Sequence, residues 1–424
     1  MPDLSPHDRS ILRRLAEQQA EIAALPVHRE KAELWRQLND LHASRPMVWI
    51  NEVCWHEMDV SDEADGSSSL ALRCADPWAR RIELGLRRLL YQWRYFPADM
   101  VVDDYLSCPL IIHNTGFGIA EDVDIVRTDE ASDVVSRHFH RQIVNPEDIE
   151  KIKLPQLTYD AAATTENYQR MTALLGDILP VKKVGVKGSW FAPWDELIRW
   201  WGIEPAMTDL VDRPEMVNAI MTRLVDAYLC QLDQWEALNL LTSNNDNTRV
   251  GSGGYGYTSA LPTPDAAASL PALRAQHLWG CATAQIFSEV SPKMHWEFAL
   301  QHEMRWLQRW GLTYYGCCEP LDIKMGILRR IPNLRKVSMS PKVSVPRAVK
   351  VVEADYVFSR KPNPAVLAWD AWSPEAARQD LTDFLALAGG CQVEIILKDI
   401  STVRYEPQRL WQWEKIAMEL VQNL

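Results

Sequence analysis

The chain has 424 residues, a mass of 48.5 kDa and a formal net charge of −12 at pH 7. This length can bury a large core as one big domain or two ordinary ones. The negative charge, without any Lys/Arg-rich run, argues against a nucleic-acid-binding protein. No apolar run approaches the ~20 residues that cross a bilayer, so we also expect no membrane association.

Eight cysteines are scattered along the chain instead of being spaced as a disulfide framework. The polar, charged residues 1–14 contain no secretory signal. Both observations predict a soluble protein in the reducing cytoplasm.

Two helices are predicted near the N-terminus. Ser5, Pro6 and Asp8 form a helix-start signal, and residues 30–42 have helical apolar spacing. Short apolar or β-branched runs then alternate with helical segments, at residues 47–50, 100–105, 183–187, 238–243, 312–315, 335–339, 355–359 and 393–397. This alternation predicts an α/β fold, a (β/α)8 TIM barrel over residues 45–424 with a helical extension at residues 1–44.

One interval breaks the alternation. Residues from about 107 to 180, after the second run, contain an extended stretch and a helix of their own. We expect an insertion on the catalytic face of the barrel, placed as a lid.

The sequence Tyr-Tyr-Gly-Cys-Cys-Glu at residues 314–319 ends the fifth run. In parallel α/β proteins the carboxyl ends of strands hold ligands and metals. Thiolates and carboxylates are zinc ligands, so Cys317 and Glu319 are candidates, with Glu52 and His56 across the barrel mouth. The alternative is two cysteines packed as small hydrophobic residues beside a solvated glutamate.

Polar residues follow the other runs as well, and each taken alone is more typical of a solvated loop. Asn245 and Asp246 could orient a substrate or form an Asx turn. Lys398 and Asp399 could bind a phosphate or carboxylate, or form a surface ion pair. The candidate catalytic residues are Asp104, Lys187, Asn245, Asp246, Tyr315, Lys398 and Asp399, and the candidate substrate-binding residues are Asn51, Trp190, Tyr255, Ser340 and Lys342.

From about residue 45 to the C-terminus the chain resembles the uroporphyrinogen decarboxylase superfamily. The resemblance is carried by residues 45–51 (RPMVWIN), 145–155 (NPEDIEKIKLP), 288–292 (SEVSP) and 315–317 (YGC). That superfamily includes cobalamin-dependent methyltransferases, which move methyl groups between corrinoid proteins and thiols. The resemblance implies a TIM barrel, a partner corrinoid protein, a zinc site at the fifth strand end and a homodimer.

The chain departs from the family at two motifs. Residues 51–55 (NEVCW) replace the arginine-containing loop with which the decarboxylases grip porphyrinogen carboxylates, and the added Glu52 would repel such a substrate. Tyr315 replaces the histidine of the methyltransferase zinc motif, and the later cysteine ligand has no match. Porphyrinogen decarboxylation is therefore disfavoured, and a zinc site would need an altered ligand set.

Three hypotheses follow. The first is a corrinoid-linked methyltransferase acting on a small substrate with zinc assistance. The second is a metal-independent lyase or decarboxylase, in which Lys187, Lys342 or Lys398 anchors the carboxylate of a small acid and Asp104 or Asp246 handles protons. The third is a non-enzymatic barrel that binds a ligand.

Overall fold

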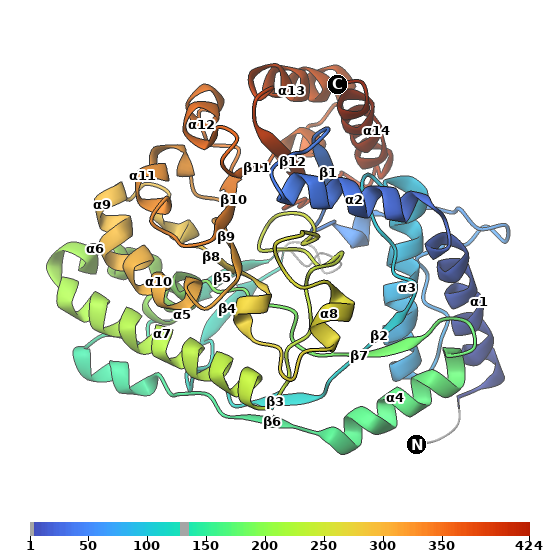
Figure 1. Ribbon diagram of the computed structural model, residues 1–424, viewed down its shortest axis with the longest axis horizontal. Helices are drawn as coiled ribbons and strands as arrows, with labels where there is room; N and C mark the ends of the chain where they lie inside the picture. The colour runs from blue at the N-terminus through green and yellow to red at the C-terminus, as the bar shows by residue number, and fades with distance from the viewer. Residues whose placement is uncertain (1–3, 128–134) are drawn as a thin grey trace.

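A six-stranded parallel sheet forms the centre of the computed structural model, which describes residues 4–127 and 135–424 (Figure 1). The strand order is β1-β12-β11-β10-β9-β8, and every neighbouring pair is parallel. The strands are β1 (Met47–Ile50), β8 (Trp279–Ala282), β9 (Leu312–Tyr315), β10 (Leu334–Met339), β11 (Val357–Arg360) and β12 (Gln392–Leu397). Because helices cover parallel sheets, most of these strand residues are buried.

A second parallel pair consists of β2 (Leu106–Pro109) and β7 (Val181–Val184). An isolated parallel bridge joins Val186 to Leu241 just beyond β7. Two antiparallel pairs lie in the interval between β2 and β7: β3 (Ile112–Asn114) with β6 (Leu157–Tyr159), and β4 (Val123–Val126) with β5 (Ser136–Phe139).

Helices surround the central sheet (Figure 1). They are α1 (Pro6–Ala23), α2 (Val27–Asn39), α3 (Pro77–Tyr95), α4 (Ala161–Leu175), α5 (Pro193–Trp201), α6 (Ile203–Asp212), α7 (Pro214–Ala237), α8 (Pro264–Ala268), α9 (Pro292–His295), α10 (Gln301–Leu307), α11 (Met325–Leu328), α12 (Val345–Val352), α13 (Pro374–Leu387) and α14 (Gln408–Gln422). The shorter turns are η1 (Trp55–Glu57), η2 (Pro146–Lys151), η3 (Ala275–His277), η4 (Gln285–Phe287), η6 (Leu321–Ile323) and η7 (Pro364–Ala368), with a π-helical stretch, η5 (Trp296–Leu300), between α9 and α10.

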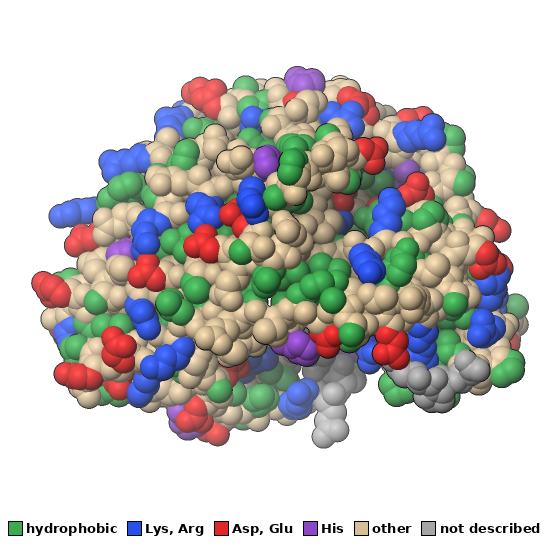
Figure 2. Space-filling view, turned by 60° about the horizontal axis from the view of Figure 1, so that its bottom comes forward, with side chains coloured by type: hydrophobic (Ala, Val, Ile, Leu, Met, Phe, Trp, Pro, Cys, Tyr) green, Lys and Arg blue, Asp and Glu red, His purple; other side chains and the backbone are tan. Residues whose placement is uncertain are grey.

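The surface carries charges of both signs. Figure 2 shows Lys and Arg side chains interspersed with Asp and Glu over one face. Within the described residues, no helix combines the length and the apolar character that crossing a bilayer requires.

The parallel α/β architecture and the two N-terminal helices confirm the corresponding sequence predictions. Two predicted strand positions differ. The strand expected at residues 100–105 begins only at Leu106, and the one expected at 238–243 contributes only the bridge at Leu241. Among the strands of the central sheet, β8 matches no predicted run; it is a short strand that contains Gly280. A side chain at Gly280 would overlap the Trp310 ring, so the glycine allows that ring to pack against the sheet.

Candidate functional site

Cys317 and Cys318 lie directly beyond the carboxyl end of β9. Gly316 turns the chain there with φ +100, and its carbonyl accepts a hydrogen bond from Ser252 at 3.2 Å. The Ser338 hydroxyl donates to the Cys317 carbonyl at 2.7 Å. These bonds fix the backbone at the turn, so that Cys317 is buried while Cys318 is exposed.

The two sulfur atoms are 3.6 Å apart and share a hydrogen bond. This bond lowers the pKa of the Cys318 thiol, whose thiolate accepts it, and raises the pKa of Cys317, whose S–H donates it. Lys398, directly after β12, donates to Cys317 Sγ at 3.4 Å. The pair is therefore built to hold one thiolate beside an ammonium group.

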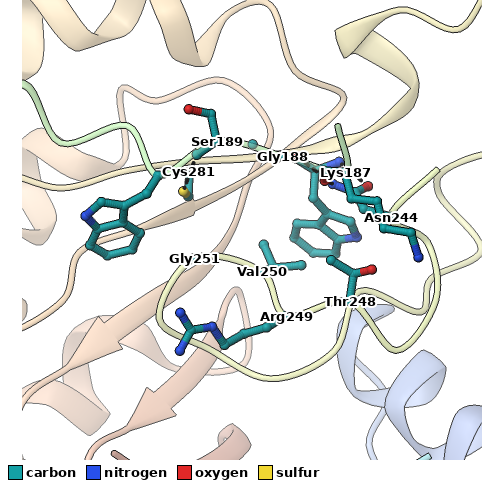
Figure 3. A pocket seen from close by; sticks show the side chains of 12 residues that line it. Lys187, Gly188, Ser189, Asn244, Thr248, Arg249, Val250, Gly251 and Cys281 are labelled. Carbon is teal, nitrogen blue, oxygen red and sulfur yellow. Dashed lines mark hydrogen bonds between the residues drawn. The ribbon is translucent and has the colours of Figure 1, made fainter. Parts of the chain in front are cut away.

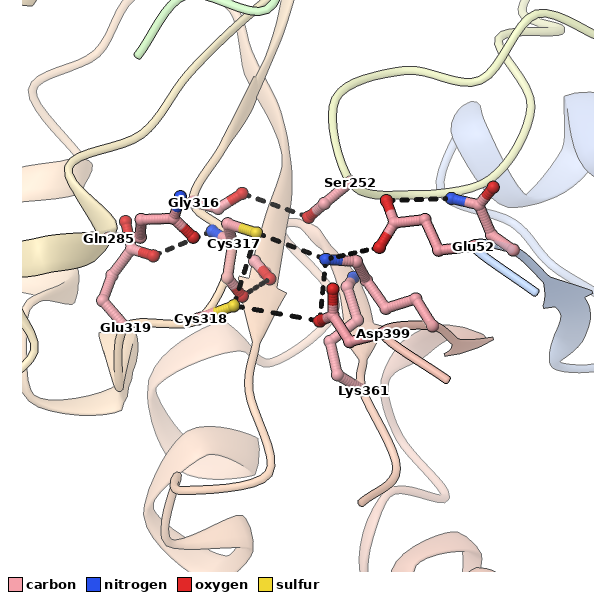
Figure 4. A network of polar contacts seen from close by, with 12 residues as sticks. Glu52, Ser252, Gln285, Gly316, Cys317, Cys318, Glu319, Lys361 and Asp399 are labelled. Atoms are coloured by element: carbon pink, nitrogen blue, oxygen red, sulfur yellow. Dashed lines mark hydrogen bonds and ion pairs between the residues drawn. The ribbon is translucent and has the colours of Figure 1, made fainter. Parts of the chain in front are cut away.

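Lys398 is the centre of a charged network at the ends of β1, β9 and β12. Figure 4 shows its partners Cys317, Glu52 and Asp399. Its Nζ lies 2.9 Å from Asp399 Oδ2 and 3.3 Å from Glu52 Oε2. Burial lowers the pKa of Lys398, but Cys317, Glu52 and Asp399 more than offset this, and the pKa is raised. Burial alone would raise the pKa of Glu52, yet Asp399, Lys398 and Arg249 bring it down to about 2. Lys398 and Glu52 are consequently both charged at neutral pH.

A cavity of about 310 Å³ opens above this network. Cys317, Cys318, Lys398 and Ser252 form part of its wall. It is also lined by Glu52, Trp190, Arg249, Gln285 and Asp399. The exposed thiol, the ammonium group and an indole therefore face one space of small-molecule size.

A neighbouring cavity of about 240 Å³ lies beside the loop at residues 248–251 (Figure 3). Trp190 and Arg249 line both cavities, so the two adjoin. Arg249 also pairs with Glu52 at 2.9 Å, which ties this loop to the end of β1.

The four predicted zinc ligands do not form one cluster. Glu319 is buried, and its carboxylate accepts hydrogen bonds from the Cys317 amide at 2.8 Å and the Thr283 hydroxyl at 3.0 Å. Glu52 is directed at Lys398 and Arg249, and His56 lies 3.6 Å from Glu57. Across residues 4–127 and 135–424, no three His, Cys, Asp or Glu side chains are grouped to hold a metal ion. The predicted ligand set does not fit zinc in this arrangement.

A second polar centre lies at the end of β7. Lys187 Nζ and Asp246 Oδ2 are 2.5 Å apart, and the Tyr105 hydroxyl accepts a longer bond of 3.4 Å from Lys187. Burial raises the pKa of nearby Asp103 to about 6. These groups line a cavity of about 640 Å³, and Lys187 also lines the 240 Å³ cavity. Two predicted catalytic residues, Lys187 and Asp246, are thus brought together.

Two buried lysines belong to the central sheet or directly follow it, Lys336 on β10 and Lys361 just after β11. Lys336 on β10 pairs with Glu394 on β12 at 2.9 Å, and neither side chain is exposed. Lys361 donates to the Tyr314 hydroxyl at 2.9 Å and to Ser359 Oγ at 2.6 Å. Burial lowers the pKa of Lys361 to about 7. Lys361 can therefore exchange a proton near neutral pH.

Tyr315, a predicted catalytic residue, belongs to a different buried chain of hydrogen bonds. Its hydroxyl donates to Glu303 at 2.8 Å and accepts from His295 Nε2 at 2.7 Å. Lys324 donates to the other ring nitrogen of His295 at 3.0 Å, which fixes the tautomer. Burial raises the pKa of Glu303 to about 8, so this carboxyl is mostly protonated at neutral pH. Tyr315 is fully buried and holds this network together.

The remaining predicted residues have varied positions. Asn245 and Tyr255 are buried in loop contacts: the Asn245 amide donates to the carbonyls of residues 258, 261 and 262, and the Tyr255 ring packs on Trp35 and Trp49. Ser340 is buried, whereas Lys342 and Asp104 are exposed. The Asn51 amide lies 3.5 Å from Glu52 Oε1. None of these six lines the two adjoining cavities among the described residues.

Sequence reasoning assigned no role to Lys361, Arg249, Ser252 or Gln285. The available signal for Lys361 is its position directly beyond a predicted strand. Arg249 and Ser252 lie in a loop and Gln285 begins the short turn η4, where no spacing rule identifies a residue that returns to the sheet edge.

Comparison with known proteins supports the fold. No protein-family model matches the sequence, and no curated protein matches it. Among solved structures, the chain is similar to a methyltransferase from Methanosarcina mazei, with a TM-score of 0.50 and 11% sequence identity over 92% of this chain and 98% of that one. At this identity the similarity shows a shared fold.

Proposed function

We propose that this protein is a methyltransferase whose reacting centre is Cys317, Cys318 and Lys398. The observation that carries the proposal is the exposed Cys318 thiol, 3.6 Å from Cys317, with Lys398 donating to Cys317 at the ends of β9 and β12. The shared fold with a methyltransferase supports it. A site at the carboxyl ends of parallel strands is where barrel enzymes hold their substrates.

Methyl transfer to sulfur needs a thiolate, because the neutral thiol is a weak nucleophile. Cys317 supplies a hydrogen bond to the Cys318 thiolate, and Lys398 supplies positive charge next to the pair. The thiolate forms an S–C bond with the methyl carbon as the bond to the donor atom breaks and its electron pair stays with the donor. Cys318 is then the methyl acceptor, and the adjoining cavities hold the small-molecule substrate.

The finer features stay predictions. They are membership of the uroporphyrinogen decarboxylase superfamily, closure of the sheet into an eight-stranded barrel at residues 45–424, a corrinoid protein docking over the mouth, zinc assistance and a homodimer. Metal analysis of the purified protein tests zinc, and co-purification with a cobalamin-binding protein tests the partner.

The experiment uses free methylcobalamin as donor. The readouts are the loss of its methyl–cobalt absorbance and the mass of the tryptic peptide 310–324, which contains both cysteines of the pair and no other. We expect a methyl group on this peptide, and transfer reduced at least about 100-fold by Cys318→Ser or Lys398→Met. Cys230→Ser, at a half-buried cysteine on α7, is the matched control. Equal transfer by wild type and Cys318→Ser would refute the assignment.

A metal-independent lyase is the second candidate, favoured by the Lys187–Asp246 pair in the 640 Å³ cavity. Lys187 would anchor a substrate carboxylate, and Asp246 or Asp103 would transfer the proton. Carbon dioxide release from small carboxylic acids that is lost in Lys187→Met and kept in Cys318→Ser would select this function over methyl transfer.

A further inference from the structure

We infer that Cys317 and Cys318 are a reversible oxidation site, at which a peroxide converts the two thiols into a disulfide between adjacent residues. A redox-sensitive site needs an accessible cysteine with a resolving cysteine next to it. Cys318 is the one exposed cysteine of the eight, all of which lie in the described part of the chain. Its partner sulfur is 3.6 Å away.

The oxidation proceeds in two balanced steps. The Cys318 thiolate attacks a peroxide oxygen, the O–O bond breaks, hydroxide leaves, and Cys318 becomes a sulfenic acid. The Cys317 sulfur then attacks the sulfenic sulfur, the S–S bond forms, and the S–O bond breaks with loss of water. The two sulfurs lose two electrons in total, and the peroxide is reduced.

Lys398 and the cavity favour both steps. The cavity of about 310 Å³ admits a peroxide to Cys318. Lys398 donates to Cys317 Sγ at 3.4 Å, which stabilises the resolving sulfur as an anion when it attacks. Cys281, which lines the adjoining cavity of about 240 Å³, is buried and has its Sγ 3.3 Å from the Ser189 carbonyl.

The backbone makes this disulfide easy to reduce. Adjacent Cα atoms are about 3.8 Å apart, below the roughly 4.4–6.8 Å typical of disulfides, so the bond is strained. The hydrogen bonds from Ser252 to Gly316 and from Ser338 to Cys317 oppose any relaxation of the turn. Strained, exposed disulfides are the ones that cellular thiols reverse.

Oxidation removes the thiolate that the proposed methyl transfer requires, so the effect on activity rests on the proposed function. The oxidation itself does not. If the disulfide forms but methyl transfer persists, the proposed function fails and this inference stands. If no disulfide forms although Cys318→Ser abolishes methyl transfer, this inference fails and the proposed function stands.

The test treats the full-length protein with hydrogen peroxide, blocks free thiols by alkylation and analyses peptide 310–324 by mass spectrometry. We expect this peptide to lose two hydrogen atoms and both alkylation sites, and to regain them with dithiothreitol. Cys230→Ser should behave as wild type. Cys317→Ser should leave a sulfenic acid on Cys318 that dimedone traps.

Two results would overturn the inference. One is a peptide 310–324 that gains oxygen atoms irreversibly without losing two hydrogens. The other is a peptide that stays fully alkylatable under conditions that already oxidise Cys230. Both readouts on the wild-type chain are independent of whether any variant folds.

Discussion

Replacing Lys361 by methionine should stabilise the protein, and more so at low pH than at high pH. The Lys361 side chain is fully buried, and burial lowers its pKa from 10.5 to about 7. Between these two values the unfolded chain holds a proton that the folded protein lacks, so the wild-type stability rises with pH across this window. At about 1.36 kcal/mol per pKa unit, the free-energy cost of burying Lys361 is about 5 kcal/mol at pH 6 and about 2 kcal/mol at pH 9.

The stability difference between Lys361→Met and wild type should therefore shrink by about 3 kcal/mol from pH 6 to pH 9. Loss of the bonds to Tyr314 and Ser359 offsets part of the gain equally at both pH values. Urea unfolding of both proteins at pH 6, 7.5 and 9 measures the difference. A difference that is independent of pH, or that grows with pH, would refute the assignment of a neutral buried lysine.

Three further outcomes are expected. Gly316→Ala should lower stability by about 1–3 kcal/mol and slow Cys318 alkylation, because Gly316 has φ +100 and an added Cβ would overlap Leu321. Thermal unfolding measures the stability, and a thiol assay measures the alkylation rate. Lys398→Met should shift the pH profile of the iodoacetamide reaction at Cys318 to higher pH, because a positive charge beside the thiol pair is lost. An unchanged profile would contradict the effect of Lys398 on the thiol pair. In wild type, the folded Glu303 has a pKa of about 8 and holds a proton between pH 5 and 8 that the unfolded chain releases, so the free energy of unfolding falls with increasing pH. In Glu303→Gln this free energy should fall less steeply. Equal slopes for the two proteins in urea unfolding would contradict this.

The fold class was predictable because it depends on local patterns. Alternating buried runs and amphipathic helices reflect which side chains leave water, and this signal survives without tertiary information. The strand β8 was missed because its residues 279–282 include a glycine whose role is set by a distant ring, Trp310. A glycine chosen for close packing looks in sequence like a loop residue.

The candidate site was partly predictable for a similar reason. The position of Cys317 after β9 follows from the strand pattern, but the direction of each neighbouring side chain does not. Glu52 has φ +52, and its carboxylate reaches Lys398, while Glu319 folds back onto the Cys317 amide. Short turns at strand ends decide these directions, and residue type alone does not reveal them.

Lys361, Lys336 and Glu394 could not be predicted as buried, because charged residues in strands are mostly exposed. The burial of Lys336 and Glu394 depends on mutual pairing, because they compensate one another at 2.9 Å across β10 and β12. Such pairs are visible only once the strand order is known.

The cavity of about 240 Å³ shares lining residues with the cavities at both polar centres. The 240 Å³ cavity is lined by Lys187, Trp190 and Arg249 among other residues. Lys187 also lines the 640 Å³ cavity, and Trp190 and Arg249 also line the cavity beside Cys318. A small molecule in the middle cavity thus lies between the Lys187–Asp246 ion pair and the exposed Cys318 thiol, whose Sγ is 3.9 Å from Asp399 Oδ2. The Lys187 charge is compensated by Asp246, and nucleophilicity favours reaction at Cys318. Under the methyltransferase proposal, the substrate binds in the middle cavity and the methyl group moves at Cys318 in the adjoining one.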